Sequence, residues 1–129
     1  MKKPPFSSLP GVLVALIALL GCGDNRSLQS VTISPAVANS SAQFTAVGSY
    51  NKTPTSVDIT TTTTWCVGSS NGVCAGNIIT GATVDSGMAQ CKTGFTGSVT
   101  VLAGQSGSSA NPDSGAPLQP FGVAQLNCP

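Results

Sequence analysis

Apolar and polar residues alternate along several short stretches of the chain, and this alternation predicts a succession of β-strands. Between residues 30 and 35, valine and isoleucine alternate with serine and threonine. Pro35 ends this strand or leaves it at a sheet edge, because proline lacks the backbone N–H that a sheet uses. Residues 42–50 form the next predicted strand and place Phe44 and Tyr50 on one face. Turn-forming residues follow it between positions 51 and 56.

Residues 57–67 carry the longest strand signal. The five successive threonines from Thr60 to Thr64 are β-branched and disfavour a helix. Alternation places Trp65, the only tryptophan, on the inner face, so we expect it in the core. Cys66 then faces the other way, which favours a local disulfide. The threonine run is also compatible with sugar binding or O-glycosylation, and this alternative is left open.

The rest of the chain adds shorter strand signals and one long loop. Further strands are expected at 76–84, 87–92, 98–103 and 119–128, with a turn at 68–72 and an exposed Gly/Ser/Asn/Pro-rich loop at 104–117. The course of the middle strands, between Cys66 and Val84, is the least defined. The total is about seven short strands without an amphipathic helix or a repeat. This pattern predicts an all-β, immunoglobulin-like β-sandwich.

The first 21 residues follow a different pattern. Lys2 and Lys3 give a positive start, and residues 11–20 form an apolar run broken by no polar side chain. A membrane-spanning helix needs about 20 apolar residues, and this run is half that length. A charged start followed by a short apolar segment is typical of an export signal peptide that is cleaved from the mature protein.

The sequence Leu19-Leu20-Gly21-Cys22 closes this segment and resembles the lipobox of bacterial lipoproteins. The resemblance implies cleavage before Cys22, a thioether-linked lipid on its sulfur, and acylation, for example by palmitate, of the new amino terminus. An ordinary secretory signal that ends in a chance cysteine is the alternative. Gly23, in place of an aspartate, favours the outer membrane or cell surface over the inner membrane. The expected organisation is a signal peptide (1–21), a lipidated linker (22–29) and one domain (30–129).

Four cysteines remain after Cys22, and an even number in a small exported domain predicts two disulfides. Four cysteines allow three pairings, and the sequence alone does not choose among them. A strand-turn-strand would bring Cys66 and Cys74 together, so we favour this pair, and Cys91–Cys128 follows by elimination. A four-thiolate zinc site would need closely spaced ligand pairs, which these cysteines lack. We therefore expect no metal and no cofactor.

Composition narrows the classes of function. Few charged residues follow the predicted signal peptide. They are the cations Arg26, Lys52 and Lys92 and the anions Asp24, Asp58, Asp85 and Asp113. No basic patch is present to neutralise phosphates, so nucleic-acid binding is not expected. The chain contains no histidine and no glutamate. Without histidine no Ser-His or Cys-His pair can form, and the scattered aspartates match no catalytic or calcium-binding motif. The sequence therefore predicts a protein that is not an enzyme.

Five segments between residues 30 and 103 resemble, in order and spacing, the successive strands of bacterial Ig-like group 2 domains. These segments are 30–35, 42–50, 63–65, 85–89 and 96–101. Members of that family usually lack these cysteines, and many end soon after the last of these strands, so residues 104–129 are an addition or a local variant. The family occurs in adhesins and other envelope proteins, and it has no catalytic motif.

The leader and the domain together predict a lipid-anchored bacterial envelope protein. The expected partners are the membrane, through the lipid on Cys22, and an unknown protein or glycan. The predicted function is adhesion or binding without catalysis. The alternative is an accessory structural subunit of a larger envelope or secretion assembly. Because a fold does not fix a function, these expectations depend on the resemblance.

Overall fold

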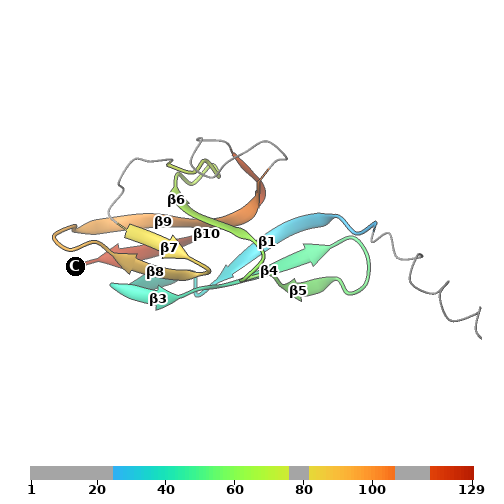
Figure 1. The fold of residues 1–129 in the computed structure, drawn as a ribbon, viewed down its shortest axis with the longest axis horizontal. Coiled ribbons are helices and arrows are strands. Elements are labelled where there is room, and N and C mark those ends of the chain that lie inside the picture. The colour runs from blue at the N-terminus through green and yellow to red at the C-terminus, as the bar shows by residue number, and fades with distance from the viewer. Residues whose placement is uncertain (1–24, 76–81, 107–116) are drawn as a thin grey trace, which may run out of the picture.

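The protein is built from β-strands throughout the part that the computed structural model describes, residues 25–75, 82–106 and 117–129 (Figure 1). In chain order the strands are β1 (Leu28–Ser34), β2 (Val37–Asn39), β3 (Ser41–Gln43), β4 (Thr45–Tyr50), β5 (Ser56–Asp58), β6 (Thr64–Gly68), β7 (Ala82–Asp85), β8 (Met88–Cys91), β9 (Gly97–Ser106) and β10 (Leu118–Cys128). Their sheet orders are β1-β4-β5, β2-β10-β9-β6 and β3-β8-β7. The result is an immunoglobulin-like β-sandwich, as predicted.

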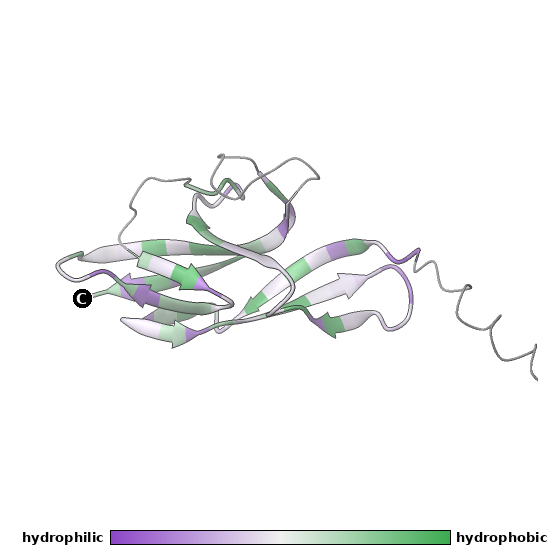
Figure 2. Cartoon of the chain, in the orientation of Figure 1, coloured by the Kyte–Doolittle hydropathy of each residue, from purple (hydrophilic) through white to green (hydrophobic). Residues whose placement is uncertain are grey.

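Two layers enclose the main core. The β3-β8-β7 sheet lies over the β2-β10-β9-β6 sheet, and the β1-β4-β5 sheet continues the first layer, since only Phe44 separates β3 from β4 (Figure 1). Phe44 is fully buried among small and medium apolar side chains from both layers. Figure 2 shows how apolar residues alternate with polar ones along the strands. Alternation is what a strand with one buried face requires.

The chain changes layers just after β1. β1 pairs antiparallel with β4, whereas β2 pairs parallel with residues 125–127 of β10. Pro35 lies at this crossing and ends β1, as predicted. β1 also passes close to β10, where a Cβ on Gly122 would lie 2.7 Å from the Val31 carbonyl oxygen. Glycine therefore permits the close contact that joins the two layers here.

The alternation in β9 places Val99, Val101 and Ala103 on one face, in the main core. Leu102, between them, points to the opposite face and is also fully buried. It belongs to a second apolar group on the outer side of the sheet, which we call the outer cluster: Cys66, Cys74, Leu102, Leu118 and Phe121. The segment from β6 to Cys74 covers the sheet at this point, so β9 is buried on both faces.

Residues 57–67 do not form one strand, contrary to the prediction. β5 and β6 are separated by a turn in which the Thr62 and Thr63 N–H groups donate to the Ile59 carbonyl, at 3.0 and 2.8 Å. The Asp58 carboxylate accepts from the Thr60 N–H at 2.9 Å and stabilises the start of the turn. These local bonds outweigh the strand preference of β-branched residues, which depends strongly on context. Trp65 is only half-buried, but it packs against the main core.

Several predicted boundaries also move. The described part contains ten strands instead of about seven, partly because the predicted strand 42–50 is interrupted at Phe44. β1 begins at Leu28, so the predicted linker 22–29 extends too far. β9 continues to Ser106, so the predicted loop 104–117 begins too early. Residues 107–116, and most of the predicted strand 76–84, lie outside the described residues.

Gly72 and Gly94 form a matched pair for testing how the turn after β6 packs. Both have a positive φ, 85° and 82°, so alanine has a similar backbone cost, about 1 kcal/mol, at either position. A Cβ at Gly72 would also lie 2.5 Å from the Phe121 ring, whereas one at Gly94 meets nothing within 4 Å. We expect Gly72→Ala to lower the free energy of unfolding by about 1–3 kcal/mol more than Gly94→Ala in urea titrations. Equal losses would contradict this packing.

Candidate functional site

The N-terminal end of the sandwich is defined by the start of β1 and the turn between β4 and β5. Ser27 and Asn51 hold these segments together: the Ser27 N–H donates to the Asn51 side chain at 2.8 Å, and the Asn51 N–H donates to the Ser27 carbonyl at 3.2 Å. The Arg26 guanidinium lies over the Tyr50 ring, 5.0 Å from its centroid. Cys22 and the leader 1–21 lie outside the described residues. Within the described ranges, no helix is long and apolar enough to cross a membrane.

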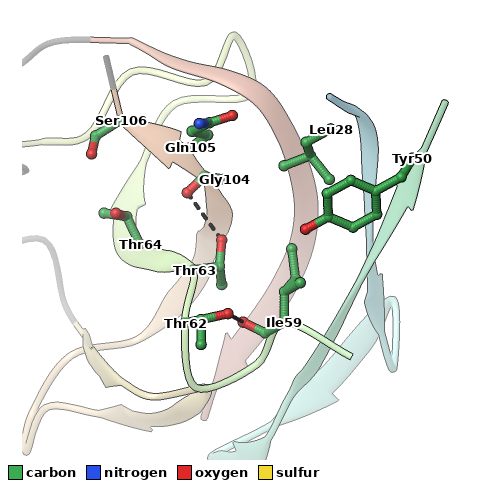
Figure 3. Close-up of a pocket in the computed structure, with 9 residues that line it drawn as sticks. All are labelled: Leu28, Tyr50, Ile59, Thr62, Thr63, Thr64, Gly104, Gln105 and Ser106. Atoms are coloured by element: carbon green, nitrogen blue, oxygen red, sulfur yellow. Dashed lines mark hydrogen bonds between the residues drawn. The ribbon is translucent and has the colours of Figure 1, made fainter. Parts of the chain in front are cut away.

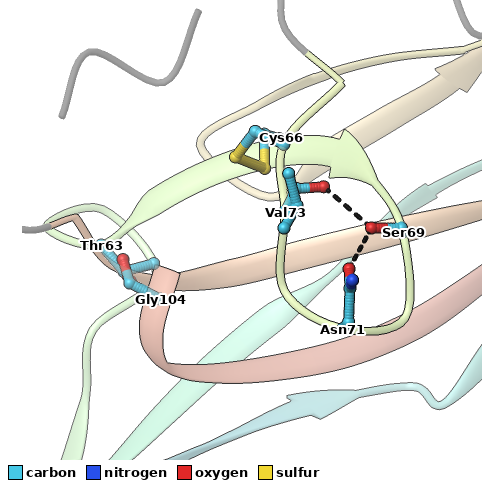
Figure 4. The surroundings of a disulfide bond; sticks show 7 residues. Thr63, Cys66, Ser69, Asn71, Val73 and Gly104 are labelled. Carbon is cyan, nitrogen blue, oxygen red and sulfur yellow. Dashed lines mark hydrogen bonds between the residues drawn. A yellow bond between two sulfur atoms is a disulfide. The ribbon is translucent and has the colours of Figure 1, made fainter. Parts of the chain in front are cut away.

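Cys66 and Cys74 form a disulfide beside a tight turn (Figure 4). The Ser69 N–H donates to the Val73 carbonyl at 3.0 Å, and the Ser69 hydroxyl bonds to the Asn71 side chain. The disulfide links β6 to the segment that follows this turn, and both cysteines belong to the outer cluster. The turn after β6 is thereby fixed against the outer face of the sheet.

Cys91 and Cys128 form the second disulfide, with 5.7 Å between their Cα atoms. Cys91 ends β8 in one layer and Cys128 ends β10 in the other. This bond therefore joins the two layers directly, at the C-terminal end of the sandwich (Figure 1). Both bonds are the pairings favoured from the sequence, Cys66–Cys74 because a strand-turn-strand joins its cysteines and Cys91–Cys128 by elimination.

Asp58 and Asp85, the two aspartates within the described residues, are not brought together. Asp58 lies in β5 and Asp85 in β7, two strands of different sheets. Hydrogen bonds from the hydroxyl and the backbone N–H of Thr60 lower the pKa of Asp58. Asp85 accepts a hydrogen bond from the Ser86 hydroxyl at 3.2 Å. Within the described residues, no three His, Cys, Asp or Glu side chains group closely enough to hold a metal ion.

A neutral pocket of about 250 Å³ lies at the N-terminal end (Figure 3). The Tyr50 ring forms one side, threonines 62–64 form the opposite side, and Gln105 extends over it from β9. Among the residues that the structure describes, no charged side chain lines it. The hydroxyls of Thr62 and Thr63 donate to the carbonyls of Ile59 and Gly104, at 3.4 and 3.0 Å. The threonine run thus has a structural role in this wall, and sugar binding by it stays a prediction.

A second pocket, of about 320 Å³, lies at the C-terminal end beside the Cys91–Cys128 bond. We call it the Lys92 pocket, because Lys92 carries the only charged side chain among the described residues that line it; Pro129, the last residue of the sequence, also lines it. Its other side chains come from the turn between β2 and β3, from β8 and from the turn between β8 and β9, and they include Ser40, Ser41, Gln90, Thr93 and Phe95. Sequence reasoning missed this pocket, because no pattern in the chain places residue 40 beside residue 92.

A scan against protein-family models finds no match for this chain, and a search of the curated proteins finds no similar sequence. The immunoglobulin-like fold is therefore established by the strand arrangement alone. The resemblance of residues 30–103 to bacterial Ig-like group 2 domains stays a prediction from five short segments.

The two disulfides are expected to differ in their contribution to stability. Their sequence separations are 37 residues for Cys91–Cys128 and 8 for Cys66–Cys74. The loop-entropy relation gives about 4 and about 2.5 kcal/mol at 25 °C, respectively. The variant Cys91→Ser/Cys128→Ser should therefore unfold at a lower urea concentration than Cys66→Ser/Cys74→Ser. The reverse order would mean that packing in the outer cluster, and not chain entropy, sets the contribution of each bond.

The lowered pKa of Asp58 predicts a dependence of stability on pH. The folded state favours the carboxylate, so its stabilisation is present above the ordinary pKa of 3.8 and is lost as the pH falls through the folded-state value. We expect Asp58→Asn to melt at a lower temperature than the wild type at pH 7, and the difference to shrink below about pH 4. Calorimetry between pH 2 and pH 7 measures this difference in melting temperature. A difference that is unchanged at pH 2 would contradict the assignment.

Proposed function

We propose that this chain is a bacterial cell-envelope lipoprotein whose immunoglobulin-like domain is a binding module without catalytic activity. The observation that carries the proposal is the short distance between Cys22 and the folded domain. Only residues 23–27 separate Cys22 from β1. At about 3.5 Å per residue, the chain spans at most about 20 Å between them. A lipid on Cys22 would hold the sandwich against the membrane by its N-terminal end.

The two disulfides support an exported protein. Such bonds persist in oxidising compartments and are rare in the cytosol. They also suit a small domain that would otherwise have little stability to spare. The absence of aspartate at position 23 favours the outer membrane or the cell surface.

A binding role is favoured over catalysis by the groups that the sites contain. The sequence has no histidine or glutamate, and the side chains of Asp58 and Asp85 accept hydrogen bonds from Thr60 and Ser86. The pockets instead present hydroxyls, amides, aromatic rings and one lysine. These groups recognise a polar ligand, and a glycan or a protein of the envelope is the expected partner.

The intact mass of the protein extracted from the membranes of the producing bacterium tests the anchor. We expect a chain that begins at Cys22, carries acyl groups and gains no mass on treatment with a thiol-alkylating reagent without prior reduction. A Cys22→Ser variant should leave the membrane fraction. A native chain of unmodified mass would exclude the anchor. If a membrane pull-down instead recovers one partner in equal amount, the domain is an accessory subunit of an assembly.

A further inference from the structure

We infer that Asn71 is a latent modification site, protected while the turn after β6 is closed and deamidated through a cyclic imide once that turn opens. An asparagine followed by glycine reacts in this way most readily, because glycine has no Cβ to hinder attack by its backbone nitrogen. Asn71–Gly72 is the only such pair in the sequence. The inference is independent of the proposed anchor and of the proposed binding role.

The reaction uses the Gly72 nitrogen as its nucleophile. This nitrogen loses its proton to hydroxide and forms a bond to the Asn71 Cγ. The bond from Cγ to the side-chain NH2 group then breaks, and ammonia leaves with a proton taken from water. Water opens the cyclic imide at either of its carbonyls. The product is aspartate or isoaspartate, and in isoaspartate the backbone runs through the former side chain and gains a methylene group.

The closed turn holds Gly72 in a state that cannot react. Its N–H donates to the Ser69 carbonyl at 3.0 Å, so the proton that must be removed is engaged. Its carbonyl accepts from the Leu118 N–H at 2.9 Å, which fixes the residue from the other side. Gly72 is also buried against Phe121, whose ring would lie 2.5 Å from a Cβ at this position. Attack on Asn71 therefore requires the turn to open.

Asn71 itself is exposed, so only its reaction partner is protected. Its side chain bonds to the Ser69 hydroxyl within the turn, and the Ser69 N–H donates to the Val73 carbonyl at 3.0 Å (Figure 4). Water already reaches the side-chain amide. The protection is thus conformational, and it is lost whenever the hydrogen bonds of the turn break.

The Cys66–Cys74 bond sets how readily the turn opens. It joins the two ends of the turn across a sequence separation of 8 residues. Without it, hydrogen bonds and the packing of Gly72 against Phe121 are what hold the turn closed. Local opening of a short exposed segment costs less free energy than unfolding of the whole domain. A thiol reductant that breaks this bond would therefore free the Gly72 nitrogen while the main core stays folded.

Deamidation makes the opening permanent. The extra methylene of isoaspartate shifts Gly72 from its place against Phe121 and from its hydrogen bond with Leu118. The outer cluster then loses the segment that covers it. Reoxidation of the cysteines does not reverse this change, so a single opening leaves a covalent record.

Peptide mapping by mass spectrometry tests the inference on the detergent-extracted protein, incubated in heavy-oxygen water at mildly alkaline pH. The label enters residue 71 only when water opens the imide. We expect Asn71 of the native protein to be labelled at least about tenfold more slowly than in guanidinium chloride. Cys66→Ser/Cys74→Ser should raise the native rate at least about tenfold. Cys91→Ser/Cys128→Ser, which leaves the turn closed, should raise it less, although it lowers the stability of the whole domain more.

A second pair of variants keeps both disulfides. Phe121→Ala removes the ring that covers Gly72 and should also speed the labelling of Asn71, whereas Val123→Ala, at an exposed position of β10, should not. Asn39, which is exposed and precedes Ser40, is the internal control and should be labelled at one rate in all folded variants.

Three outcomes would overturn the inference. Asn71 is not labelled even in the unfolded chain, or the native protein is labelled as fast as the unfolded one, or the two disulfide variants are labelled equally fast. The last result would mean that deamidation follows unfolding of the whole domain. Circular dichroism verifies that each variant is folded. If a disulfide variant does not fold, equal labelling of Phe121→Ala and Val123→Ala refutes the protection by the closed turn.

Discussion

The structure depends on one constraint, the small size of the side chains that fill its core. Five alanines line the main core: Ala46, Ala82, Ala89, Ala103 and Ala124. Among the described residues, Phe44 is the only aromatic side chain that is fully buried there. Because an alanine buries little apolar area, burial alone stabilises such a core weakly. Small side chains also allow the two layers to approach closely. The Cys91–Cys128 bond joins these two layers directly.

Besides the Cys91–Cys128 bond, the outer cluster compensates for the weak stabilisation that the small main core provides. Leu102 and Leu118 are almost completely buried on the outer face of the β2-β10-β9-β6 sheet. The segment closed by Cys66–Cys74 covers them, and the Leu118 N–H donates to the Gly72 carbonyl at 2.9 Å. The sheet thus buries apolar side chains on both faces where β9 and β10 pair. The short disulfide-closed turn acts as a partial third layer.

The sequence predicted those elements whose burial follows a simple alternation. β1 alternates buried and exposed residues, and Pro35 ends β1 as its chemistry requires. The threonine run does not form the predicted strand, because the hydrogen bond between Asp58 and Thr60 starts a turn that β-propensity alone does not reveal. The burial of Leu102 was not predicted, because the side chains that cover it come from segments distant in sequence. The Lys92 pocket was missed for the same reason, since it forms only when the turns after β2 and β8 meet.

The direction of β1 has a mechanical consequence. β1 runs from the N-terminal end toward the centre of the sandwich and pairs with β4 over residues 28–34. A load that pulls on the chain before Leu28 while the opposite end is held acts nearly parallel to these strands (Figure 1). The hydrogen bonds between β1 and β4 then resist in shear, so several must break together, whereas a load across the strands would open them one at a time. The orientation of β1 therefore suits the domain to bear tension along its length.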